Sequence, residues 1–428
     1  MNESPRAPAL LSNSSFYGTL AATRAYGESG IPVWVADGDF FGVSRWSRHA
    51  TRTLDSPGLC KPVRFVEWLI ELGAREPGVV LYPTSDDAAF LYSLHRDALS
   101  THYRMYQPSL PAMLSVLDKK RLYRIAQEVG LEVPTTWFPE SERDVERIAA
   151  DAKMPMLVKP RMQVLSPTQT KGVIVDDRAS LATRWSSFVS KSHYDDVLLA
   201  HVPDASQAML QQYLPEAAEQ IYVLAAFLTR DGEHFAARSA MKVFQRPRSL
   251  GIGLCFENAP LSPELADAAR RLAMACGYYG LFQLELIKHG DRYLLIDFNP
   301  RYYNQLAFDI ARGLPLPSIV YAAAHGDERE VARLLSRANA ETPPDDVVFC
   351  NAFGLEVMLS TQRLTGRLSA REASHWRSWR ARHRGRSIDP TRGPGDELPG
   401  IVDICAQLYG YARHPRAFLR KLVLDKTT

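Results

Sequence analysis

Residues 281–301 read LFQLELIKHGDRYLLIDFNPR, and the prediction of the fold rests on them. Two apolar runs flank the turn at Gly290-Asp291, which predicts a hairpin of two paired strands. Asp297 and Asn299 are two residues apart on one strand, so both side chains project to the same face. Glu285 lies on the preceding strand, and Asp297 interrupts an apolar run, where a carboxylate is costly unless it is paired or binds a metal. Two carboxylates and an amide oxygen indicate a Mg²⁺ site that also takes phosphates, and the alternative is two solvated acids on a hairpin.

The region before this hairpin is predicted to be rich in antiparallel strands. The pattern gives strands at 209–214, 220–229 and 235–243, and a helix at 264–276. Arg238 and Lys242 are an even number of residues apart on one strand and therefore share a face. They could bind a phosphate or a substrate carboxylate.

Three lysines are candidates for phosphate binding. Lys159 ends an apolar strand at 156–160, Lys119 opens a helix, and Lys171 precedes a strand at 172–175. A lysine at a strand end that faces a cleft suits a phosphate, although such a lysine taken alone is more often a surface residue whose stem lies along apolar neighbours. Between the two strands, residues 162–172 form a loop with one glycine, in which Ser166, Thr168, Thr170 and Lys171 could supply hydrogen-bond donors.

A candidate nucleotide hinge follows the strand at 209–214. Gln211, Gln212, Tyr213 and Leu214 could offer backbone groups to the edge of an adenine, and Glu219 could accept two ribose hydroxyls. Taken alone, the same residues are an ordinary strand end.

Strand patterns and helix patterns alternate over about the first 115 residues, and two of the predicted strands are followed by polar turns. This alternation predicts a doubly wound α/β unit, in which ligands bind beyond the carboxyl ends of the strands. The turns at 13–15 and 84–87 therefore mark the candidate substrate edge. The glycine fingerprint GxGxxG is absent from this unit, which argues against a dinucleotide site there.

Composition limits the class of protein. The chain has 428 residues, a mass of 48.0 kDa and a formal net charge of +3, so global charge gives no argument for nucleic acid. No apolar stretch approaches the length of a membrane span, no secretory signal is recognisable, and the five cysteines are scattered. We expect a cytoplasmic protein with no membrane span and no nucleic-acid partner. The Arg- and Trp-rich stretch at 371–386 is expected to be solvated, with an anionic lipid or nucleic acid as the alternative partner.

In their order along the chain, these features resemble the ATP-grasp superfamily over roughly residues 13–326. The specific part is Glu285 with Asp297-Phe298-Asn299-Pro300-Arg301, which is similar to the family's metal site Glu…(Asp/Glu)-x-Asn-x-Arg. The whole resembles predicted ATP-dependent carboligases, relatives of the carbamoyl-phosphate synthase large subunit and of carboxylate–amine ligases. The resemblance implies an α/β and α+β chain: a Rossmann-like pre-ATP-grasp domain at 1–117, a two-lobed ATP-grasp fold at 118–330 with its small lid lobe at about 150–210, and a C-terminal helical extension at 331–428.

The resemblance also implies roles for single residues. Lys119, Lys159 and Lys171 would contact ATP phosphates, residues 211–214 would form the adenine hinge, and Glu219 would take the ribose. Glu285, Asp297 and Asn299 would hold two Mg²⁺ ions, which Mn²⁺ can replace. Arg301 would meet the substrate carboxylate and the charge that develops on phosphoryl transfer, with Lys242 and Arg238 beside it. Two departures from the family pattern are the glycine-poor lid loop and Gln211, where an acid is common.

The implied activity is formation of an amide bond between a small-molecule carboxylate and an amine, through an acyl phosphate, with release of ADP and phosphate. Homodimers are common in the family. Three alternatives stay open: a ligase or carboxylase with another nucleophile, a nucleotide-binding regulatory protein without turnover, and an interaction protein that acts through its basic C-terminal stretch.

Overall fold

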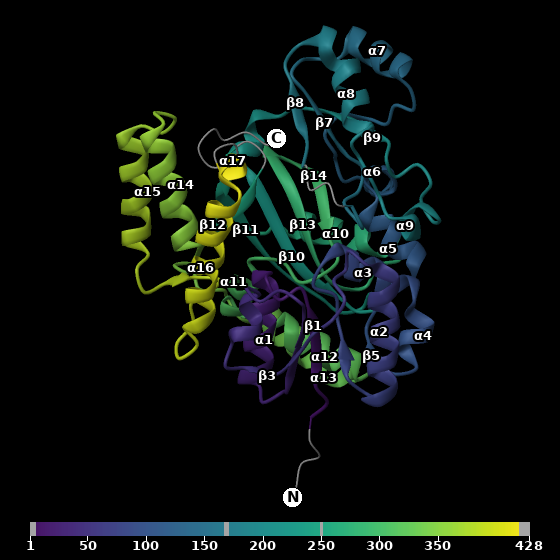
Figure 1. The fold of residues 1–428 in the computed structure, drawn as a ribbon, viewed down its shortest axis with the longest axis vertical. Coiled ribbons are helices and arrows are strands. Elements are labelled where there is room, and N and C mark those ends of the chain that lie inside the picture. The colour runs from purple at the N-terminus through teal and green to yellow at the C-terminus, as the bar shows by residue number, and fades with distance from the viewer. Residues whose placement is uncertain (1–5, 167–170, 249–250, 419–428) are drawn as a thin grey trace, which may run out of the picture.

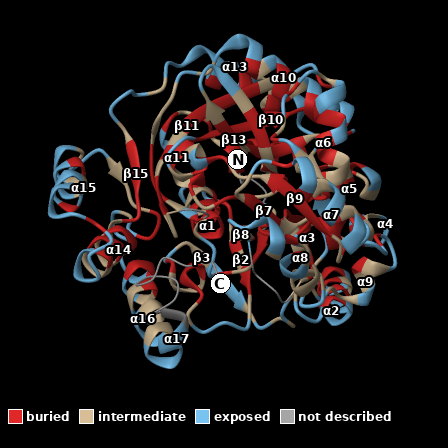
Figure 2. Cartoon of the chain, turned by 90° about the horizontal axis from the view of Figure 1, so that it is seen from above, coloured by how far each residue is buried: buried red, intermediate tan, exposed pale blue. Residues whose placement is uncertain are grey.

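The computed structural model describes residues 6–166, 171–248 and 251–418 and contains three sheets (Figure 1). A parallel sheet lies at the N-terminus, a small antiparallel sheet follows it, and a seven-stranded sheet forms the centre of the molecule. Helices cover these sheets, and the central strands β10, β11 and β13 are largely buried (Figure 2).

The N-terminal sheet has the order β3-β2-β1-β4-β5 with all its pairs parallel, as the alternation of strand and helix patterns predicts. All four residues of β1 are buried because helices pack on the sheet. Residue Asn13, directly after β1, has a φ of 52°, which turns the chain sharply at the carboxyl end of the sheet. The elements are β1 (Ala9–Ser12), α1 (Tyr17–Glu28), β2 (Val33–Ala36), η1 (Val43–Trp46), β3 (Ala50–Leu54), α2 (Pro62–Arg75), β4 (Val80–Leu81), α3 (Asp86–Leu94), α4 (Arg96–Ser100), β5 (Arg104–Met105) and α5 (Leu110–Leu117).

The small antiparallel sheet has the order β6-β9-β7-β8 and stands apart at one end of the molecule with α7 and α8 on it (Figure 1). Its own apolar cluster includes Val158, Trp185 and Leu210. The elements are α6 (Lys119–Glu128), β6 (Thr136–Trp137), α7 (Glu142–Asp151), β7 (Met156–Pro160), β8 (Val173–Val175), η2 (Arg178–Ser180), α8 (Leu181–Val189), α9 (Asp196–Leu199) and β9 (Ala208–Gln212).

The central sheet has the order β14-β13-β10-β11-β12-β15-β16. Every residue of β10 is buried, since the strand lies between two neighbours and under helices on both faces. The elements up to the end of this region are η3 (Pro215–Ala218), β10 (Ile221–Leu228), β11 (Phe235–Arg246), β12 (Ile252–Asn258), α10 (Pro263–Ala275), β13 (Gly280–His289), β14 (Arg292–Asn299), α11 (Leu306–Ala311), α12 (Leu316–Ala324) and α13 (Glu328–Ala340).

The C-terminal part is not helical throughout, and in this respect the expectation of a helical extension is corrected. Two short strands, β15 and β16, extend the central sheet beyond β12, and β15 pairs with β16 in parallel. The helices α14 and α15 form a hairpin at the side of the molecule (Figure 1). The elements are β15 (Val348–Cys350), α14 (Ala352–Leu364), α15 (Ala370–Arg382), β16 (Ser387–Ile388), α16 (Leu398–Arg413) and α17 (Pro415–Phe418).

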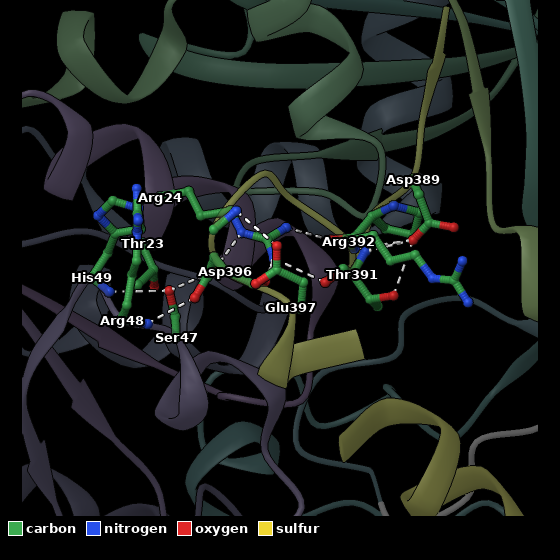
Figure 3. A network of polar contacts seen from close by, with 12 residues as sticks. Thr23, Arg24, Ser47, Arg48, His49, Asp389, Thr391, Arg392, Asp396 and Glu397 are labelled. Atoms are coloured by element: carbon green, nitrogen blue, oxygen red, sulfur yellow. Dashed lines mark hydrogen bonds and ion pairs between the residues drawn. The ribbon is translucent and has the colours of Figure 1, made fainter. Parts of the chain in front are cut away.

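A polar network holds the segment between β16 and α16 against α1 and the loop between η1 and β3 (Figure 3). The buried carboxylate of Asp396 accepts hydrogen bonds from Arg24 Nε at 2.8 Å, from Ser47 Oγ at 2.9 Å and from the backbone N–H of Arg48 at 2.8 Å. Arg24 also donates to the backbone oxygens of Thr391 and Asp396. The chain thus returns from the central sheet to its own beginning.

Candidate active site

Two carboxylates face each other across the pair β13–β14. Glu285 lies directly opposite Asp297 in the strand register, so their side chains share one face of the central sheet. The register shifts directly after Glu285, which is a local irregularity of the hairpin next to the acids. The predicted hairpin and the predicted common face are therefore both present.

Each of these carboxylates is paired with a lysine from a different part of the chain. Lys119 Nζ, from the first turn of α6, lies 2.6 Å from Asp297 Oδ1, and Lys242 Nζ, from β11, lies 3.1 Å from Glu285 Oε2. Burial works against the charge of Lys119 and of Asp297. The attraction between them outweighs burial, because the pKa of Lys119 is raised and that of Asp297 is lowered. Both groups are thus held in their charged forms.

Two further lysines belong to the same cluster. Lys159, at the end of β7, donates to Gln211 Oε1 at 3.4 Å, and burial together with the neighbouring Lys119 lowers the pKa of Lys159 to about 7. Burial, followed by the neighbouring Lys242, lowers the pKa of Lys171. Amines that are buried next to other cations are sites where an anionic ligand would be stabilised.

Arg301 joins this cluster to the N-terminal sheet. Its Nη2 donates to Asn299 Oδ1 at 2.8 Å, and its Nε lies 2.9 Å from Asp86 Oδ1, at the start of α3. Burial works against the charge of Arg301, but Asp86 raises the pKa of the guanidinium on balance. Asp86 belongs to the turn at 84–87 that the sequence marks as a substrate edge, although nothing in the sequence pairs it with Arg301.

The candidate hinge leaves the small sheet where the sequence predicts. Strand β9 ends at Gln212, and Tyr213 and Leu214 follow before η3. The side chain of Gln211 turns inward, because its Nε2 donates to Thr136 Oγ1 at 2.9 Å and to Tyr123 Oη at 3.3 Å. Glu219 is exposed and forms an ion pair with Arg248.

Arg238 does not join the cluster, and here the prediction is corrected. It shares the sheet face of Lys242, as its spacing implies, but its guanidinium donates to the backbone oxygens of Arg312 at 3.1 Å and of Glu341 at 3.2 Å, and also to that of Ala338. These carbonyl groups belong to the ends of helices that cover this end of the sheet. Arg238 thus connects the ends of α11 and α13 to β11 by hydrogen bonds, and its guanidinium does not face the carboxylate pair.

The loop between β7 and β8 contacts the start of α3 through Asp87, the last residue of the turn at 84–87 that the sequence marks as a substrate edge. The backbone N–H of Leu165 donates to Asp87 Oδ1 at 2.7 Å, and burial raises the pKa of Asp87 to about 6. Ser166 Oγ donates to the backbone oxygen of His193 at 3.0 Å. Thr168 and Thr170, two of the candidate donors of this loop, lie outside the described residues.

The donor set at the carboxylate pair fits a hard divalent cation. Glu285, Asp297 and Asn299 offer carboxylate and amide oxygens, which Mg²⁺ prefers, and their strands place all three on one face. Within the described parts of the chain, no three His, Cys, Asp or Glu side chains gather closely enough to hold a metal on their own. A two-carboxylate site of this kind leaves coordination positions for the phosphates of a substrate.

Solved structures with the same fold were found at low sequence identity. The biotin carboxylase domain of 2-oxoglutarate carboxylase from Hydrogenobacter thermophilus has a TM-score of 0.56 at 15% identity, over 79% of this chain and 71% of that chain. The biotin carboxylase of Campylobacter jejuni has a TM-score of 0.55 at 13% identity, over 78% and 72%. The L-amino acid ligase of Bacillus licheniformis has a TM-score of 0.53 at 14% identity, over 76% and 75%.

These enzymes all have the ATP-grasp fold, and this chain therefore has it as well. No family model matches the sequence, and no curated protein matches it. Among the helices of the described ranges, none has the length and apolar character that crossing a membrane requires.

Proposed function

We propose that this chain is an ATP-dependent ligase that activates a carboxylate as an acyl phosphate and joins it to an amine. The observation that carries the proposal is the pair Glu285–Asp297 in direct register, with lysines from α6, from β11 and from the small sheet converging on it. Such a site has the charges needed for a metal-bound triphosphate, and it lies where the small and central sheets meet.

The balance of charge favours a polyanionic substrate. Five basic side chains, Lys119, Lys159, Lys171, Lys242 and Arg301, surround three acids, Glu285, Asp297 and Asp86. A bound polyanion would raise the lowered pKa values of Lys159 and Lys171 and favour the charged forms of both amines. ATP supplies the missing negative charge, and Mg²⁺ held by Glu285, Asp297 and Asn299 would neutralise the phosphates further. Residues 211–214 would hold the adenine, and Glu219 the ribose.

The reaction that we assign to this site needs positioning and charge, without a nucleophile from the protein. A carboxylate oxygen of the substrate attacks the γ-phosphorus, and the bond to the β–γ bridging oxygen breaks to release ADP. The nitrogen of the amine then attacks the acyl carbon, loses a proton and displaces phosphate. Arg301, between Asp86 and Asn299, is placed to bind the substrate carboxylate and to stabilise the charge that develops on the transferred group.

The structural neighbours support two versions of this chemistry. The Bacillus licheniformis protein is an L-amino acid ligase, which agrees with an amine as the acceptor. The Hydrogenobacter thermophilus domain was solved with MgADP and bicarbonate, so a carboxylase that phosphorylates bicarbonate is the second candidate. We favour the ligase because the sequence resembles carboxylate–amine ligases.

The test is ADP release from Mg-ATP against a panel of carboxylates, with and without amines, with products identified by mass spectrometry. We expect ADP release to require one carboxylate–amine pair and to yield a product whose mass is their sum less water. ADP release with bicarbonate alone would favour the carboxylase. Absence of turnover with every pair and with bicarbonate, while ATP still raises the thermal midpoint, would favour a regulatory nucleotide-binding protein.

Two variants connect this activity to the carboxylate pair. Asp297→Asn and Glu285→Gln should each lower ADP release by about a hundredfold or more while the protein stays folded, because each removes a charge at the metal site. Asp267→Asn is the matched control, since Asp267 pairs with Arg271 on the surface of α10 and should leave the rate unchanged. Wild-type rates in both site variants would contradict the assignment of the metal ligands.

A further inference from the structure

A buried ion pair joins the two segments of the chain that supply Lys119 and Lys159. Arg161 directly follows β7, and its side chain is 5% exposed. Its Nε donates to Asp118 Oδ1 at 2.7 Å, and its Nη2 donates to Asp118 Oδ2 at 2.9 Å. Asp118 directly precedes α6, and its side chain is 1% exposed. The pair is therefore bidentate and buried, although 43 residues separate its members in the sequence.

A backbone hydrogen bond holds the same two segments together. The N–H of Lys119 donates to the backbone oxygen of Arg161 at 3.1 Å. The carboxylate of Asp118 also caps α6, because its Oδ1 accepts the N–H of Lys120 at 3.0 Å. Lys119 thus directly follows one member of the ion pair, and Lys159 lies two residues before the other member.

The two lysines belong to different packing units. Helix α6 is attached to β14, because Lys119 pairs with Asp297 and the hydroxyl of Tyr123 donates to the backbone oxygen of Ile296 at 3.1 Å. Lys159 belongs to the small sheet, whose apolar cluster is its own. The ion pair therefore connects the small sheet to the central sheet at the point where both units contribute a lysine to the site.

Arg161 has a second carboxylate partner, which stands next to no lysine of the cluster. Its Nη1 donates to Asp204 Oδ2 at 2.6 Å, and its Nη2 donates to Asp204 Oδ1 at 3.0 Å. The side chain of Asp204, in the turn before β9, is 50% exposed. Arg121, which is 41% exposed, lies 3.3 Å from Asp118 Oδ2. One guanidinium thus meets a buried acid beside the site and a half-exposed acid away from it.

An ion pair of this kind fixes geometry more than it stabilises the fold. The cost of removing two charges from water offsets most of their attraction, so a buried pair adds little net free energy of folding. Two parallel N–H···O bonds, however, select one relative orientation of the guanidinium and the carboxylate. Arg161 and Asp118 therefore fix the end of β7 against the start of α6.

The lysines beside this pair repel each other. Burial is the first cause that lowers the pKa of Lys159, and the neighbouring Lys119 is the second. Unless an anion lies between the two ammonium groups, their repulsion favours a wider separation of β7 and α6. A phosphate that contacts both lysines needs them close together. The attraction between Arg161 and Asp118 acts across the same two segments and opposes this separation.

We propose that Arg161 and Asp118 are positioning residues for a bound triphosphate, because they hold Lys119 and Lys159 at the separation that its phosphates bridge. The inference rests on the proposed function, since it takes both lysines as phosphate ligands. Neither Arg161 nor Asp118 touches the nucleotide in this assignment, and both act through the lysines beside them.

Two variants remove the ion pair and keep every phosphate ligand. Asp118→Asn removes the charge and keeps an acceptor for the N–H of Lys120, so α6 keeps its cap. Arg161→Gln removes the guanidinium. Isothermal titration calorimetry should give each variant a dissociation constant about tenfold above the wild type, both for Mg-ATP and for inorganic triphosphate. Arg161→Lys keeps a charge without the fork and should recover part of this loss, to about threefold above the wild type.

Asp204→Asn is the matched control, because it removes a carboxylate from the same guanidinium away from the lysines. It should change both dissociation constants less than about twofold. Adenosine, which carries no phosphate, should bind the wild type and Asp118→Asn equally. Thermal unfolding of every variant shows which are folded, and Arg161→Lys decides the question if Asp118→Asn and Arg161→Gln are not.

The outcomes separate this role from a role in stability and from the proposed function. Lower thermal midpoints of Asp118→Asn and Asp204→Asn, with triphosphate binding unchanged in both, would overturn the positioning role and leave the proposed function intact. Equal weakening of adenosine and triphosphate in Asp118→Asn would overturn it as well, because the whole site would then be disturbed. A wild type that binds neither Mg-ATP nor triphosphate would contradict the proposed function, and the positioning role with it.

Discussion

Asp87 shows how a single carboxyl can oppose stability at neutral pH. Burial raises its pKa to about 6, next to Asp86, while its Oδ1 accepts the N–H of Leu165. The folded protein therefore binds this proton more tightly than the unfolded chain, and the stabilisation decreases as the pH rises from about 4 to about 6. Above that range the charged form is disfavoured by about 3 kcal/mol, since one unit of pKa corresponds to about 1.4 kcal/mol.

Asp87→Asn should consequently increase the free energy of unfolding by about 3 kcal/mol at pH 7.5 and change it little at pH 4, because the amide keeps the acceptor and removes the charge. Urea unfolding at the two pH values measures the difference. Asp97→Asn is the control, since the side chain of Asp97 is 98% exposed on α4. An equal effect of Asp87→Asn at both pH values would contradict the explanation.

Arg301 is the second single residue for which the structure leads to a prediction, here on the kinetics of the proposed reaction. We predict that Arg301→Ala lowers kcat at least about a hundredfold and changes KM for ATP less than about threefold, since the guanidinium serves the transferred group more than the bound nucleotide. Steady-state kinetics with ADP detection separates the two constants. An equal change in both would make Arg301 a simple binding residue.

At the scale of single elements, Arg238 stabilises the packing of helices on strand β11. It holds β11 to the backbone at the ends of the helices above it, through carbonyl groups of Arg312, Ala338 and Glu341. Arg238→Met leaves these buried carbonyl groups without their donor and should destabilise the protein by about 2–4 kcal/mol. KM for ATP should stay unchanged, which thermal unfolding and kinetics on the same preparation would establish. A raised KM with full stability would return Arg238 to the site.

Elements with a local signal could be predicted from the sequence, and elements formed by distant partners could not. The hairpin β13–β14 has its turn, its alternation and its acids within one short segment, and the prediction places Glu285 and Asp297 correctly on one face. Strands β15 and β16 are two or three residues long and exist because distant chain segments supply their partners.

The same limit applies to the contacts of the site. The sequence could identify Lys119 as a candidate by its place at the start of a helix, and Arg301 by the resemblance of its motif to that of the family. The sequence could not reveal that Lys119 pairs with Asp297, 178 residues away, or that Arg301 pairs with Asp86, 215 residues away. For Arg238, the even spacing from Lys242 correctly predicts which face of the sheet it lies on. Its contacts depend on helices that are distant in the sequence, so no local pattern could predict them.

At the scale of the whole molecule, the network around Asp396 connects the C-terminal part of the chain to residues 24–48 of the N-terminal part (Figure 3). Although burial raises the pKa of this carboxyl, Arg24, the backbone N–H of Arg48 and Ser47 lower it on balance. The charged carboxylate of Asp396 thus stabilises the folded protein at neutral pH, and this stabilisation is lost as the pH falls and the carboxylate is protonated. Asp396→Ala should lower the free energy of unfolding by about 3–5 kcal/mol, because it removes the only carboxylate that Arg24 pairs with among the described residues and leaves this guanidinium with backbone oxygens alone.

Limited proteolysis tests the same joint directly. In Asp396→Ala we expect faster cleavage between residues 386 and 398 than in the wild type, because this segment loses its side-chain contacts with α1 and with the loop between η1 and β3. Asp345→Ala, in an exposed position before β15, is the control and should leave the cleavage pattern unchanged. Cleavage at the wild-type rate in Asp396→Ala would show that the segment is held by other contacts.

The contact between Arg301 and Asp86 has a consequence for how this architecture can be inherited and re-engineered. Arg301, at the candidate site, pairs with Asp86 from the opening α/β unit, and the neighbouring Asp87 accepts a hydrogen bond from the loop between β7 and β8. The opening unit is therefore not an exchangeable module. A chimera that takes its first hundred or so residues from another protein would need an acid at position 86 to pair with Arg301 and a hydrogen-bond acceptor at position 87 for the N–H of Leu165, and natural recombination at this boundary faces the same requirement.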